Sequence, residues 1–174
     1  MFDDATIRAT EFFDSQSVGL ALGYFELDRT SIHGPMHWAR VLENGMLLAK
    51  LNGVSELVVG LFALWHDSHR HNDEADIFHG PRASKTVRNL GLGLGGADLI
   101  LLAEAIAGHT NRLHSTNLTL ATCWDADRLD ISRCAREINP DFLTTPAAKR
   151  PDVIAWAQER GSAGHVPSFA LEYL

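Results

Sequence analysis

The residues of this chain best suited to chemistry begin with a histidine and an aspartate at the end of an apolar stretch. Residues 57–70 read LVVGLFALWHDSHR, and the first nine of them carry no polar side chain. At helical period such a stretch is apolar on every face, which predicts a buried helix. His66 and Asp67 would then lie in the interior, where unpaired charges cost on the order of several kcal/mol. The pair therefore needs charged partners or a metal ion.

One candidate partner is an aspartate within residues 117–133. Steps of three and four place Asp127 on an apolar column of this segment, formed by Leu120, Cys123, Trp124, Ile131 and Cys134. Asp125 lies on a helix face that carries both apolar and polar side chains, so Asp127 is the predicted buried ligand. Asp125 and Asp130 are interpreted as part of a solvated acidic face.

A second candidate is His37, which lies in line with Val41 and Leu48 and is therefore expected to face the core. His37, His66, Asp67 and Asp127 together offer imidazole nitrogens and carboxylate oxygens. This set suits divalent Mn, Fe, Zn, Ni, Co or Mg. A bound divalent cation lowers the pKa of water to about 7 and polarises a phosphoryl oxygen, so the set favours metal-assisted hydrolysis.

The elements that must position these residues are helices. Helical periodicity recurs along the whole chain, and no segment alternates apolar and polar residues in the manner of a strand. The sequence therefore predicts an all-α bundle with its metal site between helices. Helices are expected over residues 3–15, 18–27, 35–51, 55–67, 77–90, 97–107, 117–133 and 152–160.

Composition narrows the class of protein. The chain has 174 residues, of which 45% are hydrophobic, and this predicts one domain over residues 1–174. A net charge of −7 argues against a protein that binds nucleic acid through its overall field. The acidic N-terminus does not resemble a secretory signal and no apolar run approaches the roughly 20 residues of a membrane span, so we expect a cytoplasmic protein without a membrane role.

The site motifs resemble a known family. HWARV from His37, LWHD from Leu64 and DADRLD from Asp125 are similar to the HD-domain superfamily of metal-dependent phosphohydrolases, in which a histidine, a His-Asp doublet and a later aspartate bind metal. The resemblance covers residues 31–133 and leaves residues 140–174 as a C-terminal extension. It implies an HD-type helical fold with His37, the doublet and Asp127 as ligands.

The resemblance also implies roles for further residues. Some HD proteins hold two metals through two additional histidines, and His79 and His109 occupy similar places here. They are candidate ligands of a second metal, with substrate contact or orientation of the other ligands as alternatives. The doublet and these two histidines are thus the predicted catalytic residues, with one or two divalent metals per chain.

Phosphate chemistry also needs cations near the metal. The candidates are Arg70, Arg82, Lys85 and Arg128, and Arg70 is preferred because it follows the doublet by three residues. Arg128 points about 100° away from Asp127 on a helix, so it could instead hold a neighbouring aspartate. A general acid could come from His69, His71 or Asp73. Three other histidines lack such a context: His33, His114 and His165. The last two are interpreted as surface residues.

Three functions follow as expectations. The leading one is hydrolysis of a small phosphate ester, a phosphomonoester or phosphodiester, with a nucleotide-like molecule as the substrate class implied by the resemblance. A second is oxygen-dependent cleavage at a di-iron centre, as in some histidine-rich HD proteins. A third is a non-catalytic, metal-binding module that senses a nucleotide.

Overall fold

A computed structural model of the chain describes residues 2–173, and it is all-helical over that range, as predicted. No helix in this part of the chain is both long and apolar enough to cross a bilayer. The elements are α1 (Phe2–Phe12), α2 (Ser15–Leu22), α3 (Pro35–Asn52), α4 (Glu56–Trp65), α5 (His79–Leu90), α6 (Gly96–Gly108), α7 (Leu118–Arg128), α8 (Pro151–Ser162) and the short 3₁₀ helices η1 (Ile131–Cys134), η2 (Pro140–Phe142) and η3 (Ser168–Tyr173).

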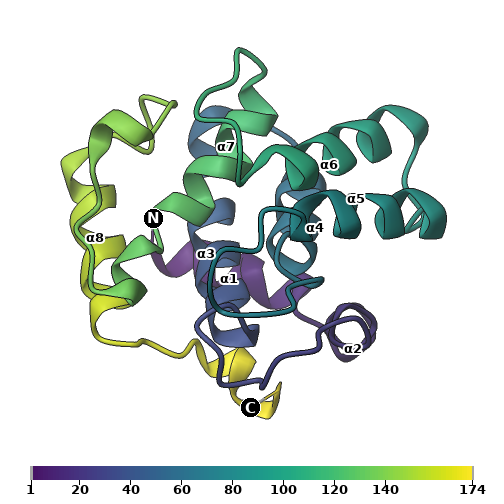
Figure 1. Ribbon diagram of the computed structural model, residues 1–174. Coiled ribbons are helices and arrows are strands. Elements are labelled where there is room, and N and C mark those ends of the chain that lie inside the picture. The colour runs from purple at the N-terminus through teal and green to yellow at the C-terminus, as the bar shows by residue number, and fades with distance from the viewer. Residues whose placement is uncertain (1, 174) are drawn as a thin grey trace.

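Helix α3 lies at the centre of the domain and packs against α1, α4 and α7 (Figure 1). Helices α5 and α6 form an antiparallel pair beside α4, and α8 lies on the opposite side of the molecule against η1. Three of the four tryptophans, Trp38, Trp65 and Trp124, are fully buried between these helices. The extension predicted from residue 140 onward packs on the same core, through Val153, Ala157 and Ala170.

Local signals set the limits of the central helices. Pro35 occupies the first turn of α3, where its missing N–H has no helical partner, and Gly53 ends the helix with a left-handed φ of 67°. The Ser55 hydroxyl caps α4 by accepting the Val58 amide. At Gly45 a Cβ would lie 2.7 Å from Val59 Cγ1, so this glycine lets α3 and α4 pack closely.

Three predicted boundaries were wrong near the functional residues. The predicted helix 117–133 is divided, because α7 ends at Arg128 and η1 follows. Helix α5 begins at His79 instead of Ile77, since Asp76 forms a turn in which its carboxylate accepts the Phe78 amide. Helix α4 ends at Trp65, so the His66-Asp67 doublet lies immediately beyond it.

Candidate metal centre

Asp67 lies at the centre of a cluster of histidines. One carboxylate oxygen, Oδ2, is 3.6 Å from Nε2 of His37 and 3.7 Å from Nε2 of His66. The other, Oδ1, is 2.9 Å from Nε2 of His79 and 3.6 Å from Nε2 of His109. All five side chains are at least 90% buried. The two oxygens of one carboxylate therefore face two different pairs of histidines.

The four histidines are oriented in the same way. Each ring directs its Nδ1 away from the cluster centre, toward a group that can only accept a hydrogen bond. The acceptors are the Asp130 carboxylate for His37 (2.7 Å) and the backbone carbonyls of Ala63, Asp76 and Ile106 for His66 (3.0 Å), His79 and His109 (2.7 Å). Nδ1 therefore carries the hydrogen, and in the neutral ring Nε2 keeps its lone pair toward the centre. Histidines that bind metal are held in this way.

The lone pairs of each histidine pair face one another at short range. Nε2 of His37 is 3.0 Å from Nε2 of His66, and Nε2 of His79 is 2.8 Å from Nε2 of His109. Burial lowers the pKa of His66 to about 3, so its ring is neutral near pH 7. Two neutral nitrogens that both present lone pairs repel unless a cation lies between them. Nitrogen ligands about 2.1 Å from a tetrahedral metal are about 3.4 Å apart, similar to the spacing here.

Three groups of ligand atoms lie close enough together to hold a metal. One consists of His33, His37 and Asp67, and the other two share no residue with each other. In the first ligand group, His37, His66 and Asp127, Asp127 Oδ1 lies 3.3 Å from Nε2 of His37 and 3.7 Å from Nε2 of His66. The second ligand group consists of Asp67, His79 and His109. Within each group the ligand atoms lie within 4.8 Å of one another. Asp67 Oδ2 also faces the histidines of the first group, so the two groups adjoin at this carboxylate.

The carboxylates of the cluster are ionised. Burial would raise the pKa of Asp67, but the surrounding histidines outweigh burial and hold that pKa well below its usual value, and among them the His33 ring donates to Oδ2. The pKa of Asp127 is lowered in the same way, since His37 and His66 outweigh its burial. Ionised carboxylates are the protonation state that metal binding requires of these ligands.

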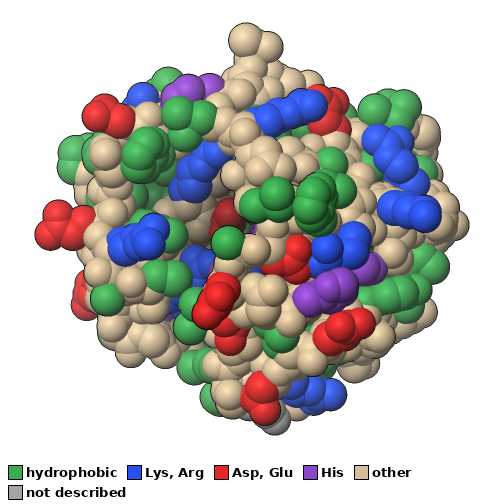
Figure 2. All heavy atoms as spheres, in the orientation of Figure 1, with side chains coloured by type: hydrophobic (Ala, Val, Ile, Leu, Met, Phe, Trp, Pro, Cys, Tyr) green, Lys and Arg blue, Asp and Glu red, His purple; other side chains and the backbone are tan. Residues whose placement is uncertain are grey.

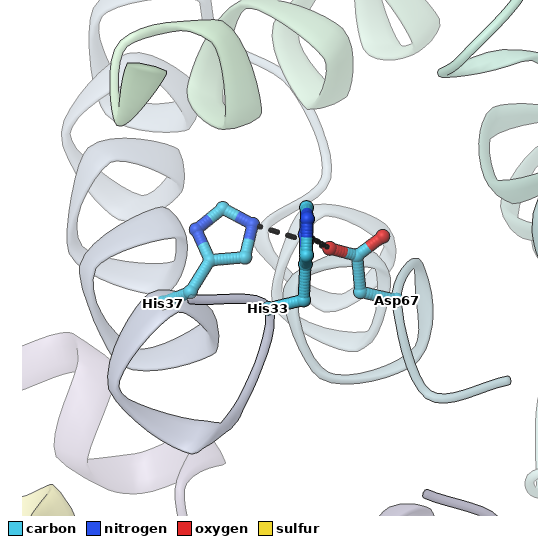
Figure 3. Close-up of side chains that lie close together, drawn as sticks. All are labelled: His33, His37 and Asp67. Atoms are coloured by element: carbon cyan, nitrogen blue, oxygen red, sulfur yellow. Dashed lines mark hydrogen bonds and ion pairs between the residues drawn. The ribbon is translucent and has the colours of Figure 1, made fainter. Parts of the chain in front are cut away.

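The structure adds a histidine to which the sequence analysis gave no role. His33 is 7% exposed, and its Nδ1 lies 2.7 Å from the Asp67 Oδ2 that His37 also approaches (Figure 3). The indole of Trp38 donates to the His33 carbonyl at 2.8 Å and fixes the segment before α3. Helical periodicity could not have indicated it, because His33 lies before α3, which begins at Pro35.

The burial predicted for the aspartates of α7 was wrong. Asp125 is fully buried and accepts the backbone amides of Thr144 at 2.8 Å and Thr145 at 2.7 Å. Asp127 is the more accessible of the two, with 21% of its side chain exposed, yet it is the one that reaches the histidines. Asp130 does not belong to a solvated face either, because it is only 1% exposed.

Asp130 instead supports the first ligand group. Besides the Nδ1–H of His37, it accepts Nε of Arg40 at 2.7 Å and Nη2 of Arg40 at 3.1 Å. Arg40 also donates to the carbonyl of His165 at 2.9 Å. Although burial would raise the pKa of Asp130, His37 and Arg40 outweigh it and lower that pKa. A buried charged network thus fixes the His37 ring and connects it to the C-terminal segment.

The structure places some of the predicted phosphate-binding cations beside the cluster and others away from it. Arg70 lies at the cluster, with Nε 3.2 Å from Asp67 Oδ1. Arg82 instead binds Asp76 and the carbonyl of His69, while Lys85 is exposed on α5. Neither lines the cavity over the cluster. The structure adds Arg133, which lines that cavity beside His33, with Nη2 3.4 Å from Nδ1.

Arg128 does not hold a neighbouring aspartate, and phosphate binding by it stays a prediction. It lines the cavity over the cluster, but its guanidinium donates to backbone carbonyls and not to an aspartate. Those carbonyls belong to Arg112 at 2.6 Å, Leu113 at 2.5 Å and Phe142 at 3.1 Å. Arg128 therefore holds two loops together at the edge of the site.

The three candidate general acids lie outside the cavity over the cluster. His69 stacks on Tyr24, with ring centroids 5.0 Å apart, and pairs with Thr86. Asp73 accepts the Ser31 hydroxyl, and His71 is exposed. The exposed positions of His114 and His165 agree with their interpretation as surface residues.

Two adjoining cavities open beside the cluster. The cavity over the cluster, of about 210 Å³, is lined by Asp67, Asp127 and His109 together with the three arginines Arg70, Arg128 and Arg133. The side cavity, of about 420 Å³, begins at residues 109–113 and extends to residues 136–143. Figure 2 shows this face of the molecule hollowed to the left of its centre, with acidic atoms visible inside and basic side chains beside the opening.

Comparisons with known proteins gave no match: no protein-family model fits the chain, and neither the curated proteins nor the solved structures contain a similar one. The functional argument therefore depends on the motifs of the sequence and on the geometry of the cluster.

Proposed function

We propose that this protein is a divalent-metal-dependent phosphohydrolase of the HD type that acts on a small phosphate ester. One observation carries the proposal: two pairs of buried histidines present facing Nε2 lone pairs on opposite sides of the Asp67 carboxylate. Adjacent cations that share a carboxylate are the arrangement used in two-metal phosphoryl transfer, where the metals are about 3.5–4 Å apart.

The donor set fits such cations. Four imidazole nitrogens and the oxygens of Asp67 and Asp127 form a borderline-to-hard set, which suits Mn, Fe, Co, Ni or Zn better than an all-oxygen site would and still accommodates Mg. The first ligand group would hold one ion and the second group the other, with one Asp67 oxygen directed to each. Ala63, Asp76, Ile106 and Asp130 fix the rings so that binding requires little rearrangement.

The residues around the cluster suit attack on phosphorus. When bound, the divalent cations supply a water of lowered pKa and neutralise charge on the phosphoryl oxygens. Arg70 and Arg133 line the same cavity and can bind the remaining phosphoryl oxygens, where a guanidinium forms paired hydrogen bonds. His33 donates to Asp67 Oδ2 and holds the carboxylate in place. The cluster is largely buried, which strengthens these electrostatic contacts relative to those in water.

The test combines metal analysis with a screen for turnover. The purified protein is analysed for bound metals, then assayed with phosphomonoesters, phosphodiesters and nucleotides after loading with Mn, Mg, Co, Ni or Zn. We expect up to two ions per chain and metal-dependent release of phosphate or of a phosphomonoester product. His66→Asn should lose metal and activity, whereas the matched variant His71→Asn, at an exposed histidine outside the cavity, should keep both.

Other outcomes would contradict the proposal. A loaded protein that binds nucleotides and hydrolyses no ester in the panel would support the sensing module. Bound iron that changes oxidation state, together with oxygen consumption, would support oxygen-dependent cleavage.

A further inference from the structure

We propose that the side cavity binds the organic part of the substrate, and that this part is a compact apolar or aromatic group. This inference rests on the proposed function, because the phosphoryl group must first be placed over the histidine–aspartate cluster. It names the class of ester that the same site prefers: alkyl or aryl phosphates over phosphates of polar sugars.

The side cavity adjoins the place expected for phosphorus. His109, Thr110, Arg128 and Ile131 line both cavities, so the two spaces are neighbours. His109 is a member of the second ligand group, and the Thr110 hydroxyl is 3.3 Å from its Nε2. A phosphoester bound at the cluster could therefore extend its organic group directly into the larger space.

The lining of the side cavity favours an apolar group. Its apolar side chains come from both of its walls and from η1: Leu113, Ile131, Ile138, Phe142 and Leu143. Leu113 and Phe142 both line the cavity and are 47% and 53% exposed, so part of their apolar surface is available to a ligand. A volume of about 420 Å³ is within the range of small-molecule sites and is large enough for a ring.

The two walls are held in place by hydrogen bonds to α7. Arg128 donates to the carbonyls of Arg112 and Leu113 on one wall and of Phe142 on the other. Asp125, one turn earlier, accepts the amides of Thr144 and Thr145 just beyond the second wall. Because both anchors are on the helix that carries Asp127, the shape of the side cavity is coupled to the position of the cluster. This preformed shape is what a binding site for a defined group requires.

The test uses phosphonates, which carry an organic group on phosphorus and resist hydrolysis. Calorimetry measures their binding to the manganese-loaded protein, with inorganic phosphate as the reference and methyl-, ethyl-, propyl-, butyl- and phenylphosphonate as the series. Each methylene that enters the side cavity should tighten binding by about fourfold, and phenylphosphonate should bind more tightly than ethylphosphonate. The readout is affinity, so it does not depend on turnover.

Two variants locate the effect. Phe142→Ala and Leu113→Ala remove exposed apolar walls while leaving the backbone carbonyls that Arg128 binds. Each should reduce the ratio of the phenylphosphonate affinity to the phosphate affinity by several-fold. Ile100→Ala is the matched control, because Ile100 is 56% exposed on α6 and lines neither cavity, and it should leave that ratio unchanged.

Failure of this inference and failure of the proposed function would give different binding results. If phosphate binds to the loaded protein but affinity does not increase along the series, or if the increase persists in both wall variants, the side cavity is not the subsite and the inference is overturned. If neither phosphate nor any phosphonate binds to the fully loaded protein, the proposed function is overturned together with the inference.

Discussion

The two ligand groups of the cluster are supported in different ways. The first group takes its residues from α3, the end of α4 and α7, the three helices at the centre of the domain, and the His37 ring is fixed by the buried Asp130–Arg40 pair. The second group takes His79 from the start of α5 and His109 from the end of α6, a helix pair at the edge. Its two rings donate to carbonyls only three residues earlier in the chain.

This difference indicates that the two ligand groups depend on different parts of the fold. In the first group His37 is fixed by a long-range contact, since His37 and Asp130 are 93 residues apart, whereas His66 donates to a carbonyl three residues earlier. The second depends on how closely α5 and α6 pack, because the Nδ1–H of each of its rings donates to a backbone carbonyl and not to a carboxylate. We therefore expect tighter binding at the first group, and the variants below test this comparison from the largest expected effect to the smallest.

The largest effect is expected from Asp67→Asn, because Asp67 is the only residue of the cluster whose two oxygens face both groups. The amide has nearly the same shape but lacks the negative charge, so both metal positions should be lost and turnover abolished. Metal content after dialysis and turnover of the best ester measure this. Asp73→Asn, at an exposed carboxylate, is the control. Retention of one tightly bound ion would show that Asp67 serves a single position.

A matched pair on α7 separates metal binding from folding. Asp127→Ala should remove the ion of the first group and turnover, with little loss of stability, because this side chain is 21% exposed. Asp125→Ala should keep the metal but leave two buried amides unpaired, each at a cost of about 1–3 kcal/mol. Metal analysis and thermal unfolding of both variants test the contrast. Metal loss in Asp125→Ala with retention in Asp127→Ala would reverse the assignment.

The same helix shows what the sequence could and could not predict. Periodicity and apolar neighbours correctly predicted an all-helical fold, and the same reasoning selected His37 and Asp127, which the structure brings together with the His66-Asp67 doublet. Burial of Asp125 could not be predicted, because its partners lie at residues 144–145 in a segment without periodicity. Arg133 could not be placed either, since the predicted continuous helix would have pointed it elsewhere.

A substitution at the close approach of α5 and α6 tests the second ligand group alone. A Cβ on Gly80 would lie 2.5 Å from the Ile106 carbonyl and 3.2 Å from the His109 ring, so Gly80→Ala must push α5 away from α6. We expect destabilisation of about 1–3 kcal/mol, as for other overpacked contacts, and selective loss of the ion at His79 and His109. Gly95→Ala, where a Cβ meets nothing within 4 Å, is the control. Metal titration of each variant, with one equivalent retained in Gly80→Ala, would support separate positions.

The smallest effect is expected from Asp130→Asn, which changes a supporting residue and not a ligand. The amide oxygen can still accept the Nδ1–H of His37, but the charge that pairs with Arg40 is lost. Loss of such a supporting contact weakens metal binding by about 10–100-fold, and we expect the lower end because one hydrogen bond remains. The weakening should be confined to the first ligand group, because the rings of the second group are held by backbone carbonyls that no side-chain substitution removes. Competition with a chelator, measured for each equivalent of metal, distinguishes the two ligand groups. Equal weakening of both equivalents would mean that the groups act as one site.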